Sequence, residues 1–240
     1  MYFDKILGIF LKNWPFFLRG AINTIIISLV ATTIGFFIGL LVGIIRTIPE
    51  PRTAGKRWIW RIVKGLTSIY IEVFRGTPMM VQSMLIFYGF PLFLGIRLPK
   101  MLAAFIIVSV NTGAYMAEIV RGGILSVDQG QYEAAKAIGM NHVQTMVYVV
   151  LPQAIRNILP ATGNEFIINI KDTSVLNVIG VSELFFQTAT VSGINFMYFE
   201  TFFIASAIYL MLTFTITRVL RLLEAKMDGK KNYSLNQQQV

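Results

Sequence analysis

The sequence has no cysteine, a single histidine and few charged residues, which make up 14% of its 240 positions. Without cysteine, disulfides, thiolate catalysis and cysteine-ligated metal sites are excluded. A soluble domain usually carries about 25% charged residues, whereas this chain is 55% hydrophobic. A soluble core of this size does not need so much apolar sequence, so the excess predicts contact with lipid.

Signature motifs of enzymes are also missing. The chain has neither H-E-x-x-H nor G-x-S-x-G, and its one histidine, His142, lies in a polar segment where a surface role is expected. It has no G-x-x-x-x-G-K-[ST], so it should not bind ATP through a P-loop. We therefore expect no enzyme activity, no catalytic residue, and no metal or cofactor bound by this chain. An intramembrane enzyme that uses only carboxylates, and a channel, remain alternatives.

The chain is basic, with 21 Lys and Arg against 12 Asp and Glu and a net charge of +9. In a soluble protein this balance would suggest nucleic acid as a partner. Here the cations lie mostly between or beside apolar runs, so the positive-inside rule of membrane proteins explains them better. We expect membrane lipid as a partner and no nucleic acid.

Five apolar segments have lengths close to those of membrane-spanning helices. A helix needs about 20 residues to cross roughly 30 Å of hydrocarbon. The segments predict an all-α integral membrane protein with about five transmembrane helices, and their length does not indicate a barrel. They are 20–45, 78–96, 101–120, 159–180 and 201–217.

Five spans place the two chain ends on opposite sides of the membrane. Basic residues are dense at 46–64 and again from 218 onward, and sparse at 97–100. The positive-inside rule then predicts an N-terminus outside and a C-terminus inside. We interpret 1–19 as an N-terminal interfacial helix, 20–223 as the transmembrane domain and 224–240 as a disordered cytoplasmic tail.

The first apolar segment carries a stripe of small residues. Ala31, Gly35, Gly39 and Gly43 recur every four residues, which predicts a flat face for close helix packing. The alternative is the ordinary abundance of glycine in membrane helices.

A polar interlude at 122–160 separates the third and fourth apolar segments. Its stretch from Glu133 onward reads as a helix of small residues that ends at Leu151–Pro152, which we interpret as a helix stop. Ala134, Ala135 and Gly139 add little side-chain bulk, so another protein can approach closely. A water-exposed segment on the inner side of a membrane domain predicts a docking site for a soluble partner.

The fourth apolar segment carries charge. Glu165, Asn169 and Asp172 are spaced i, i+4 and i+7, so they share one helix face, and Asn164 and Lys171 share an adjacent one. An unpaired charge at membrane depth costs at least about 2.5–3.5 kcal/mol, so these faces should point at protein or water. We interpret Asn164, Glu165, Asn169 and Asp172 as part of a translocation path. The alternative is a structural ion pair between Lys171 and a carboxylate.

The third apolar segment repeats this spacing with Asn111, Tyr115 and Glu118. Asn111 and Tyr115 are predicted to line the same path. Glu118 lies one turn from Arg121, so we expect a structural or gating pair.

A third polar cluster begins the second apolar segment. Pro78 removes a helix hydrogen bond, and broken membrane helices are where transporters bind substrates. We therefore add Thr77 and Gln82 to the predicted path, with a simple kink as the alternative. Just before this elbow, Glu72 and Arg75 are three residues apart and are expected to pair.

Several stretches resemble the polar amino acid uptake branch of the ABC importer permeases. The inner-loop pattern of that family is Glu-Ala-Ala, three residues, Gly, nine residues, Ile-x-Leu-Pro. This chain has Val149 in place of the isoleucine and matches the rest at Glu133, Ala134, Ala135, Gly139, Leu151 and Pro152. Further similar stretches are 70–82, 114–124, 152–166 and 171–184, so the resemblance covers roughly 20–223.

The resemblance implies the type I ABC importer fold in the cytoplasmic membrane of a prokaryote. It implies a second permease copy or a close homologue, with a homodimer favoured, and two ATPase subunits that hold ATP and Mg. The ATPases would contact Glu133, Ala134, Ala135 and Gly139. An extracytoplasmic binding protein would deliver a polar amino acid. The two carboxylates favour a basic one, and a neutral or acidic polar amino acid is the alternative.

Overall fold

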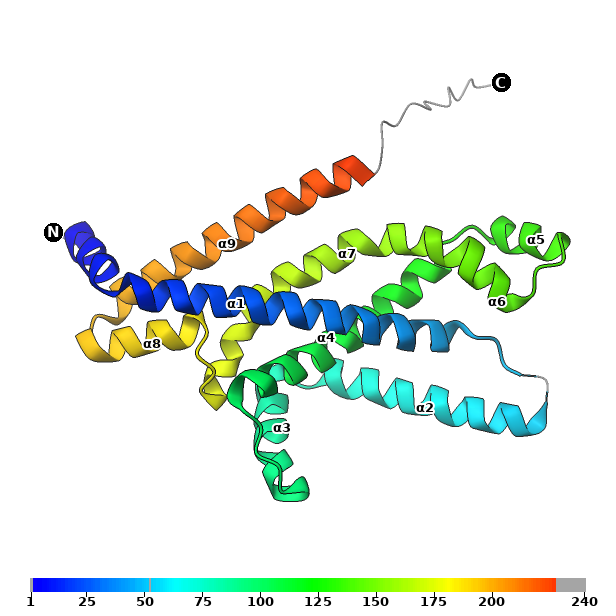
Figure 1. The fold of residues 1–240 in the computed structure, drawn as a ribbon, viewed down its shortest axis with the longest axis horizontal. Helices are drawn as coiled ribbons and strands as arrows, with labels where there is room; N and C mark the ends of the chain where they lie inside the picture. The colour runs from blue at the N-terminus through cyan, green and yellow to red at the C-terminus, as the bar shows by residue number, and fades with distance from the viewer. Residues whose placement is uncertain (1, 52, 228–240) are drawn as a thin grey trace.

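The computed structural model describes residues 2–51 and 53–227, and all regular elements in these ranges are helical. Figure 1 shows an elongated bundle of long helices, so the predicted all-α membrane fold is confirmed. The helices are α1 (Tyr2–Thr47), α2 (Ala54–Gly76), α3 (Met79–Leu94), α4 (Lys100–Leu125), α5 (Gln129–Ala137), α6 (His142–Gln144), α7 (Leu151–Asp172), α8 (Leu184–Asn195) and α9 (Tyr198–Met227), with a π-helix η1 (Thr145–Val150) before α7 and a 3-10 helix η2 (Thr173–Ile179) after it.

Three of the described helices, α1, α4 and α9, are each long and apolar enough to cross a membrane unbroken. Two further candidate spans are bent pairs. The α2–α3 pair bends by 114°, and the helix from His142 to Ile179 bends by 55° into α8. The predicted number of about five spans is reached when each bent pair counts as one.

The second predicted span, 78–96, contains α3, and the predicted elbow near Pro78 is the bend between α2 and α3. α3 has 16 residues, about 24 Å of helix, which is short of the hydrocarbon thickness. It projects sideways from the bundle as the second half of a bent pair (Figure 1). Most of the basic segment 46–64 is helical, because α1 runs to Thr47 and α2 begins at Ala54.

Within the described residues, parts of both predicted terminal segments belong to helices of the core. The predicted interfacial segment forms one helix with the first span, α1, which contains Pro15. Proline removes one helical hydrogen bond, and Figure 1 shows the first turns at an angle to the rest. That this segment lies at a membrane interface stays a prediction. α9 runs to Met227, and the rest of the predicted tail, 228–240, lies outside the described residues.

Close packing of α1 against α4 forms the centre of the molecule. A Cβ atom on Gly39 would lie 2.2 Å from Met116 Cβ, and one on Gly43 would lie 2.6 Å from Val120 Cγ1. Ala31 is fully buried. The small-residue stripe is therefore a helix–helix contact, as predicted. This contact fixes the position of α4, and with it the position of the polar residues of α4, relative to α1.

The polar interlude folds differently from the prediction at its end. Leu151–Pro152 begins α7, so the predicted helix stop there is wrong. Pro152 is the second residue of α7 and follows the π-helix η1, so the helical run from His142 to Ile179 continues through it. The actual stop is Gly139, whose φ of 82° ends α5. Figure 1 shows α5 and α6 at the same end of the bundle as the end of α1 and the start of α2.

Candidate functional site: a polar cavity at the helix elbow

A cavity of about 250 Å³ lies where the α2–α3 elbow, α4 and α7 meet. Residues from three distant parts of the chain line it, and six of the eight predicted path residues are among them. The lining residues are Thr77, Pro78, Met79, Asn111, Tyr115, Glu165, Ile168, Asn169 and Asp172. Gln82 and Asn164 are the two predicted path residues that do not line it.

The helical spacing on α7 explains which residues reach the cavity. Glu165, Asn169 and Asp172 share one face and all line it. Asn164 is exposed on another face. Lys171 lines two other cavities, beside α8 and α9. Among the described residues no ion pair joins Lys171 to a carboxylate, so the predicted structural pair is absent there.

Gln82 stabilises the elbow rather than facing the cavity. Its Nε2 donates to the carbonyl oxygens of Phe74, at 3.0 Å, and Thr77, at 2.9 Å. It also donates to Thr77 Oγ1 at 2.9 Å. The two carbonyl oxygens are backbone groups freed by the helix break, and such groups must find partners away from water. Asn111 Nδ2 donates to Gln82 Oε1 at 2.9 Å, so α4 is tied to the elbow through the same side chain.

Asn169 is also occupied by protein partners. Its Nδ2 donates to Thr32 Oγ1 at 2.8 Å, and its Oδ1 accepts from Thr112 Oγ1 at 3.1 Å. All three side chains are buried. Asn169 therefore joins α7 to α1 and α4, and its amide is not free to bind a molecule in the cavity.

Glu165 and Asp172 have no such partners. Glu165 is only 8% exposed, yet across residues 2–51 and 53–227 no group donates a hydrogen bond to it or to Asp172. The two carboxylates are close enough to repel each other electrostatically. Asp172 is exposed and interacts electrostatically with Lys171, whereas Glu165 is buried. Buried charges in proteins are normally paired, so Glu165 favours a cation as its partner in the cavity.

Arg75 lies beside the cavity wall. Its guanidinium carbon is 5.5 Å from the centroid of the Tyr115 ring, a cation–π distance. The predicted Glu72–Arg75 pair is absent from the described part of the chain, and both side chains are exposed. The two residues share a helix face, but the Tyr115 ring offers Arg75 another contact.

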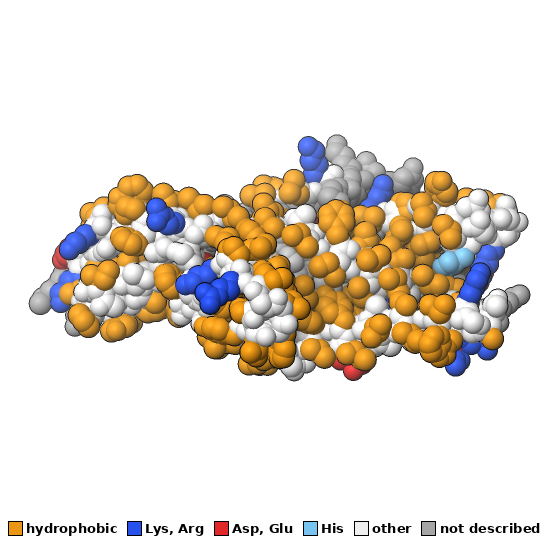
Figure 2. All heavy atoms as spheres, turned by 60° about the horizontal axis from the view of Figure 1, so that its bottom comes forward, with side chains coloured by type: hydrophobic (Ala, Val, Ile, Leu, Met, Phe, Trp, Pro, Cys, Tyr) orange, Lys and Arg blue, Asp and Glu red, His pale blue; other side chains and the backbone are white. Residues whose placement is uncertain are grey.

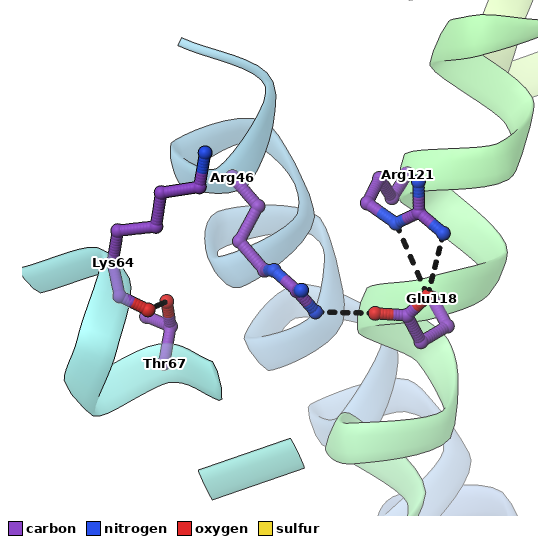
Figure 3. A network of polar contacts seen from close by, with 5 residues as sticks. All are labelled: Arg46, Lys64, Thr67, Glu118 and Arg121. Carbon is purple, nitrogen blue, oxygen red and sulfur yellow. Dashed lines mark hydrogen bonds and ion pairs between the residues drawn. The ribbon is translucent and has the colours of Figure 1, made fainter. Parts of the chain in front are cut away.

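The predicted pair of Glu118 and Arg121 is present and belongs to a larger cluster. Arg121 Nη2 lies 2.9 Å from Glu118 Oε2. Arg46, at the end of α1, donates to the other carboxylate oxygen, Oε1 (Figure 3). Sequence reasoning missed Arg46, because nothing in the local pattern links positions 72 residues apart. The cluster fastens the end of α1 to α4; a gating role stays a prediction.

The predicted docking segment is only partly exposed. Glu133, Ala134 and Gly139 are exposed, whereas Ala135 is buried on the inner side of α5. Three large, exposed apolar residues that sequence reasoning missed lie in the same polar interlude, 122–160. Ile138 is 75% exposed, Val143 67% and Tyr148 71%. The sequence signal that could have found these residues is the presence of large apolar side chains within an otherwise polar segment. Figure 2 shows hydrophobic side chains also at the end of the molecule where His142 lies.

Comparisons with known proteins agree with this architecture. The sequence pattern of the binding-protein-dependent transport system inner membrane components matches residues 51–229. The chain is 39% identical to the glutamine transport system permease protein GlnP of Escherichia coli K12 over 214 residues, covering 89% of this chain and 93% of that protein. It is 33% identical to the arginine transport system permease protein ArtQ of Bacillus subtilis 168, covering 90% and 94%.

A solved structure is similar over the same range. The crystal structure of an amino acid ABC transporter with histidines superimposes with a TM-score of 0.79 at 40% identity, and the match covers 89% of this chain and 95% of that one. Such relatives are permease subunits and not enzymes. The chain belongs to the family of binding-protein-dependent transport system inner membrane components.

Proposed function

We propose that this chain is the permease subunit of an ATP-driven importer and forms the path for a basic amino acid. The observation that carries the proposal is the pair of carboxylates, Glu165 and Asp172, that line one cavity and accept no hydrogen bond from any described residue. The relatives support the amino acid class, because they include glutamine and arginine permeases and a transporter solved with histidines.

The remaining polar atoms of the cavity favour a cation. The amide nitrogens of Asn111 and Asn169 already donate within the protein. Thr77 Oγ1 donates to the Val73 carbonyl oxygen. The groups left for a ligand are mainly acceptors, the carboxylates of Glu165 and Asp172 foremost. A side-chain ammonium, guanidinium or imidazolium supplies donors that match them.

The energy for transport comes from other subunits. Two ATPases bind ATP and Mg and dock on α5 and the turn after it. The exposed residues Glu133, Ala134 and Gly139 contact them, and Ala135 supports these residues from the inner side of the helix. Ile138, Val143 and Tyr148 add apolar contact area there. The docking end is cytoplasmic, so the C-terminus is inside and the N-terminus outside. A second copy of the chain completes the membrane domain, and an extracytoplasmic binding protein delivers the amino acid.

Reconstituted vesicles that contain the permease, its ATPase and its binding protein test the proposal. Uptake of labelled arginine should require ATP and the ATPase, and uptake without either would contradict it. Glu165→Gln should reduce arginine uptake about tenfold, as expected for loss of a hydrogen-bonded charge, and should affect glutamine uptake less. Glu72→Gln, an exposed carboxylate without an ion pair in the described residues, is the matched control. Equal loss for both amino acids would favour a neutral substrate instead.

A further inference from the structure

The cavity leaves one part of its proposed ligand without a partner. An amino acid carries a carboxylate as well as an ammonium, and none of the cavity-lining residues is Lys or Arg. Glu165 and Asp172 would repel the carboxylate. A site that accepts a whole amino acid beside two carboxylates therefore needs a cation near its edge, which would pair with the ligand carboxylate.

Arg75 is placed to supply this cation. Its guanidinium lies against the ring of Tyr115, which lines the cavity. It also precedes the cavity-lining Thr77 by two residues at the end of α2. The contact with an aromatic face holds the guanidinium beside the cavity without using its N–H donors.

Arg75 is also uncommitted. In the part of the chain that the structure describes, it forms no ion pair with any carboxylate. Glu118 interacts electrostatically with Arg75, but both of its oxygens are already bound, one by Arg46 and the other by Arg121 (Figure 3). Lys171, the cation next to Asp172 in sequence, lines cavities on the α9 side instead.

We propose that Arg75 binds the α-carboxylate of the amino acid whose cationic groups face Glu165 and Asp172. The inference rests on the proposed function of this cavity. A planar guanidinium can hold a carboxylate through two parallel hydrogen bonds, which a lysine cannot reproduce. A basic amino acid then finds one partner for each charge: two carboxylates for its two cations and Arg75 for its carboxylate.

Paired ligands with and without a carboxylate test the role of Arg75. The permease complex, purified without its binding protein, is titrated with arginine and with agmatine, which is arginine lacking the carboxylate. Arg75→Gln should weaken arginine binding about tenfold or more, the loss expected when a hydrogen-bonded charge is removed, and should leave agmatine binding unchanged. Arg75→Lys should restore part of the arginine affinity. Arg97→Gln, an exposed arginine between α3 and α4, is the control and should change neither.

The outcomes separate this inference from the proposed function. Equal weakening of arginine and agmatine by Arg75→Gln, or no effect on arginine, would overturn the role of Arg75. A wild-type complex that binds glutamine but not arginine would overturn the basic substrate only. The role of Arg75 is then tested with glutamine and 4-aminobutanamide, its decarboxylated counterpart. A wild-type complex that binds each amine as tightly as its amino acid would also overturn the role of Arg75.

Discussion

Asn169 on α7 donates a hydrogen bond to Thr32 on α1 at 2.8 Å, across 137 positions of sequence. The same amide accepts from Thr112 on α4 at 3.1 Å. Three spans thus meet at one buried side chain, directly behind the cavity that holds Glu165 and Asp172. Away from water such a bond cannot be replaced by solvent, so this junction sets where α7 stands against the rest of the bundle.

Asn169→Ala should destabilise the protein, because it leaves the hydroxyls of Thr32 and Thr112 without their buried partner. Loss of such a partner costs about 1–3 kcal/mol. Thermal unfolding in detergent measures the change. Asn164→Ala, an exposed asparagine on the same helix, is the control and should be close to neutral.

Coupling between Asn169 and Thr32 can be measured directly with a double-mutant cycle. Thr32→Val combined with Asn169→Ala should show an interaction free energy of about 0.6 kcal/mol or more, the range found between membrane helices. Strict additivity of the two substitutions would show that this hydrogen bond does not stabilise the bundle.

Gly39→Ala should separate α1 from α4. The added Cβ would lie 2.2 Å from Met116 Cβ and 2.7 Å from the Met116 carbonyl carbon, and a backbone atom cannot move aside locally. Overpacking of this kind costs about 1–3 kcal/mol. Gly122→Ala is the matched control, since a Cβ there meets nothing within 4 Å and alanine stabilises a helix by up to about 1 kcal/mol. Thermal unfolding should move in opposite directions for the two variants, and a similar loss in both would contradict the packing.

The sequence predicts features that depend on local spacing. The small-residue stripe at Gly35, Gly39 and Gly43 contacts α4 as expected, and the spacing of Glu165 and Asp172 places both in one cavity. Each of these follows from the helical period alone. The break at the elbow follows from Pro78 in the same way, although its angle of 114° does not.

Features whose residue types suit two roles were not predictable from one sequence. The polarity of Gln82 and its place near Pro78 predict a path residue, but the side chain donates to the freed carbonyl oxygens of Phe74 and Thr77 instead. Leu151–Pro152 predicts a helix stop, but the helical run continues from η1 through Pro152 into α7. In both cases the residue type allowed two roles, and the neighbouring backbone selects between them.

Gln82→Glu should be at least as harmful as Gln82→Leu, although it is nearly isosteric. The Nε2 of Gln82 donates to three oxygens of Phe74 and Thr77, and a carboxylate has no donor and would repel them. The free energy of unfolding should fall by about 1–3 kcal/mol, and ATP-dependent uptake should fall with it.

The exposed Gln153 provides the control for this substitution. Its Nε2 also donates to a backbone oxygen, that of Val149, at 2.8 Å, but water can replace that bond at the surface. Gln153→Glu should therefore change stability little. A Gln82→Glu variant that keeps wild-type stability and uptake would show that the elbow does not need this donor.

Gly139 should tolerate asparagine better than alanine or valine. Its φ of 82° is a conformation in which side chains with a Cβ are strained by roughly 1–2 kcal/mol, and asparagine is the residue other than glycine that adopts it most readily. A Cβ there meets nothing within 4 Å, so backbone strain and not crowding decides the outcome. Gly139→Val should loosen the turn between α5 and α6 and weaken docking of the ATPase.

Two measurements locate the effect of Gly139 substitutions. Amide hydrogen exchange should quicken in α5 and α6 but not in α4, because the capping bond from Met140 N–H to the Ala135 carbonyl oxygen, at 3.0 Å, depends on this turn. Co-purification of the ATPase should decrease in the order Gly, Asn, Ala, Val at this position. Gly8→Ala, at the opposite end of the bundle and also in open space, should leave both unchanged. Unaltered ATPase binding in Gly139→Val would place the docking surface elsewhere on the protein.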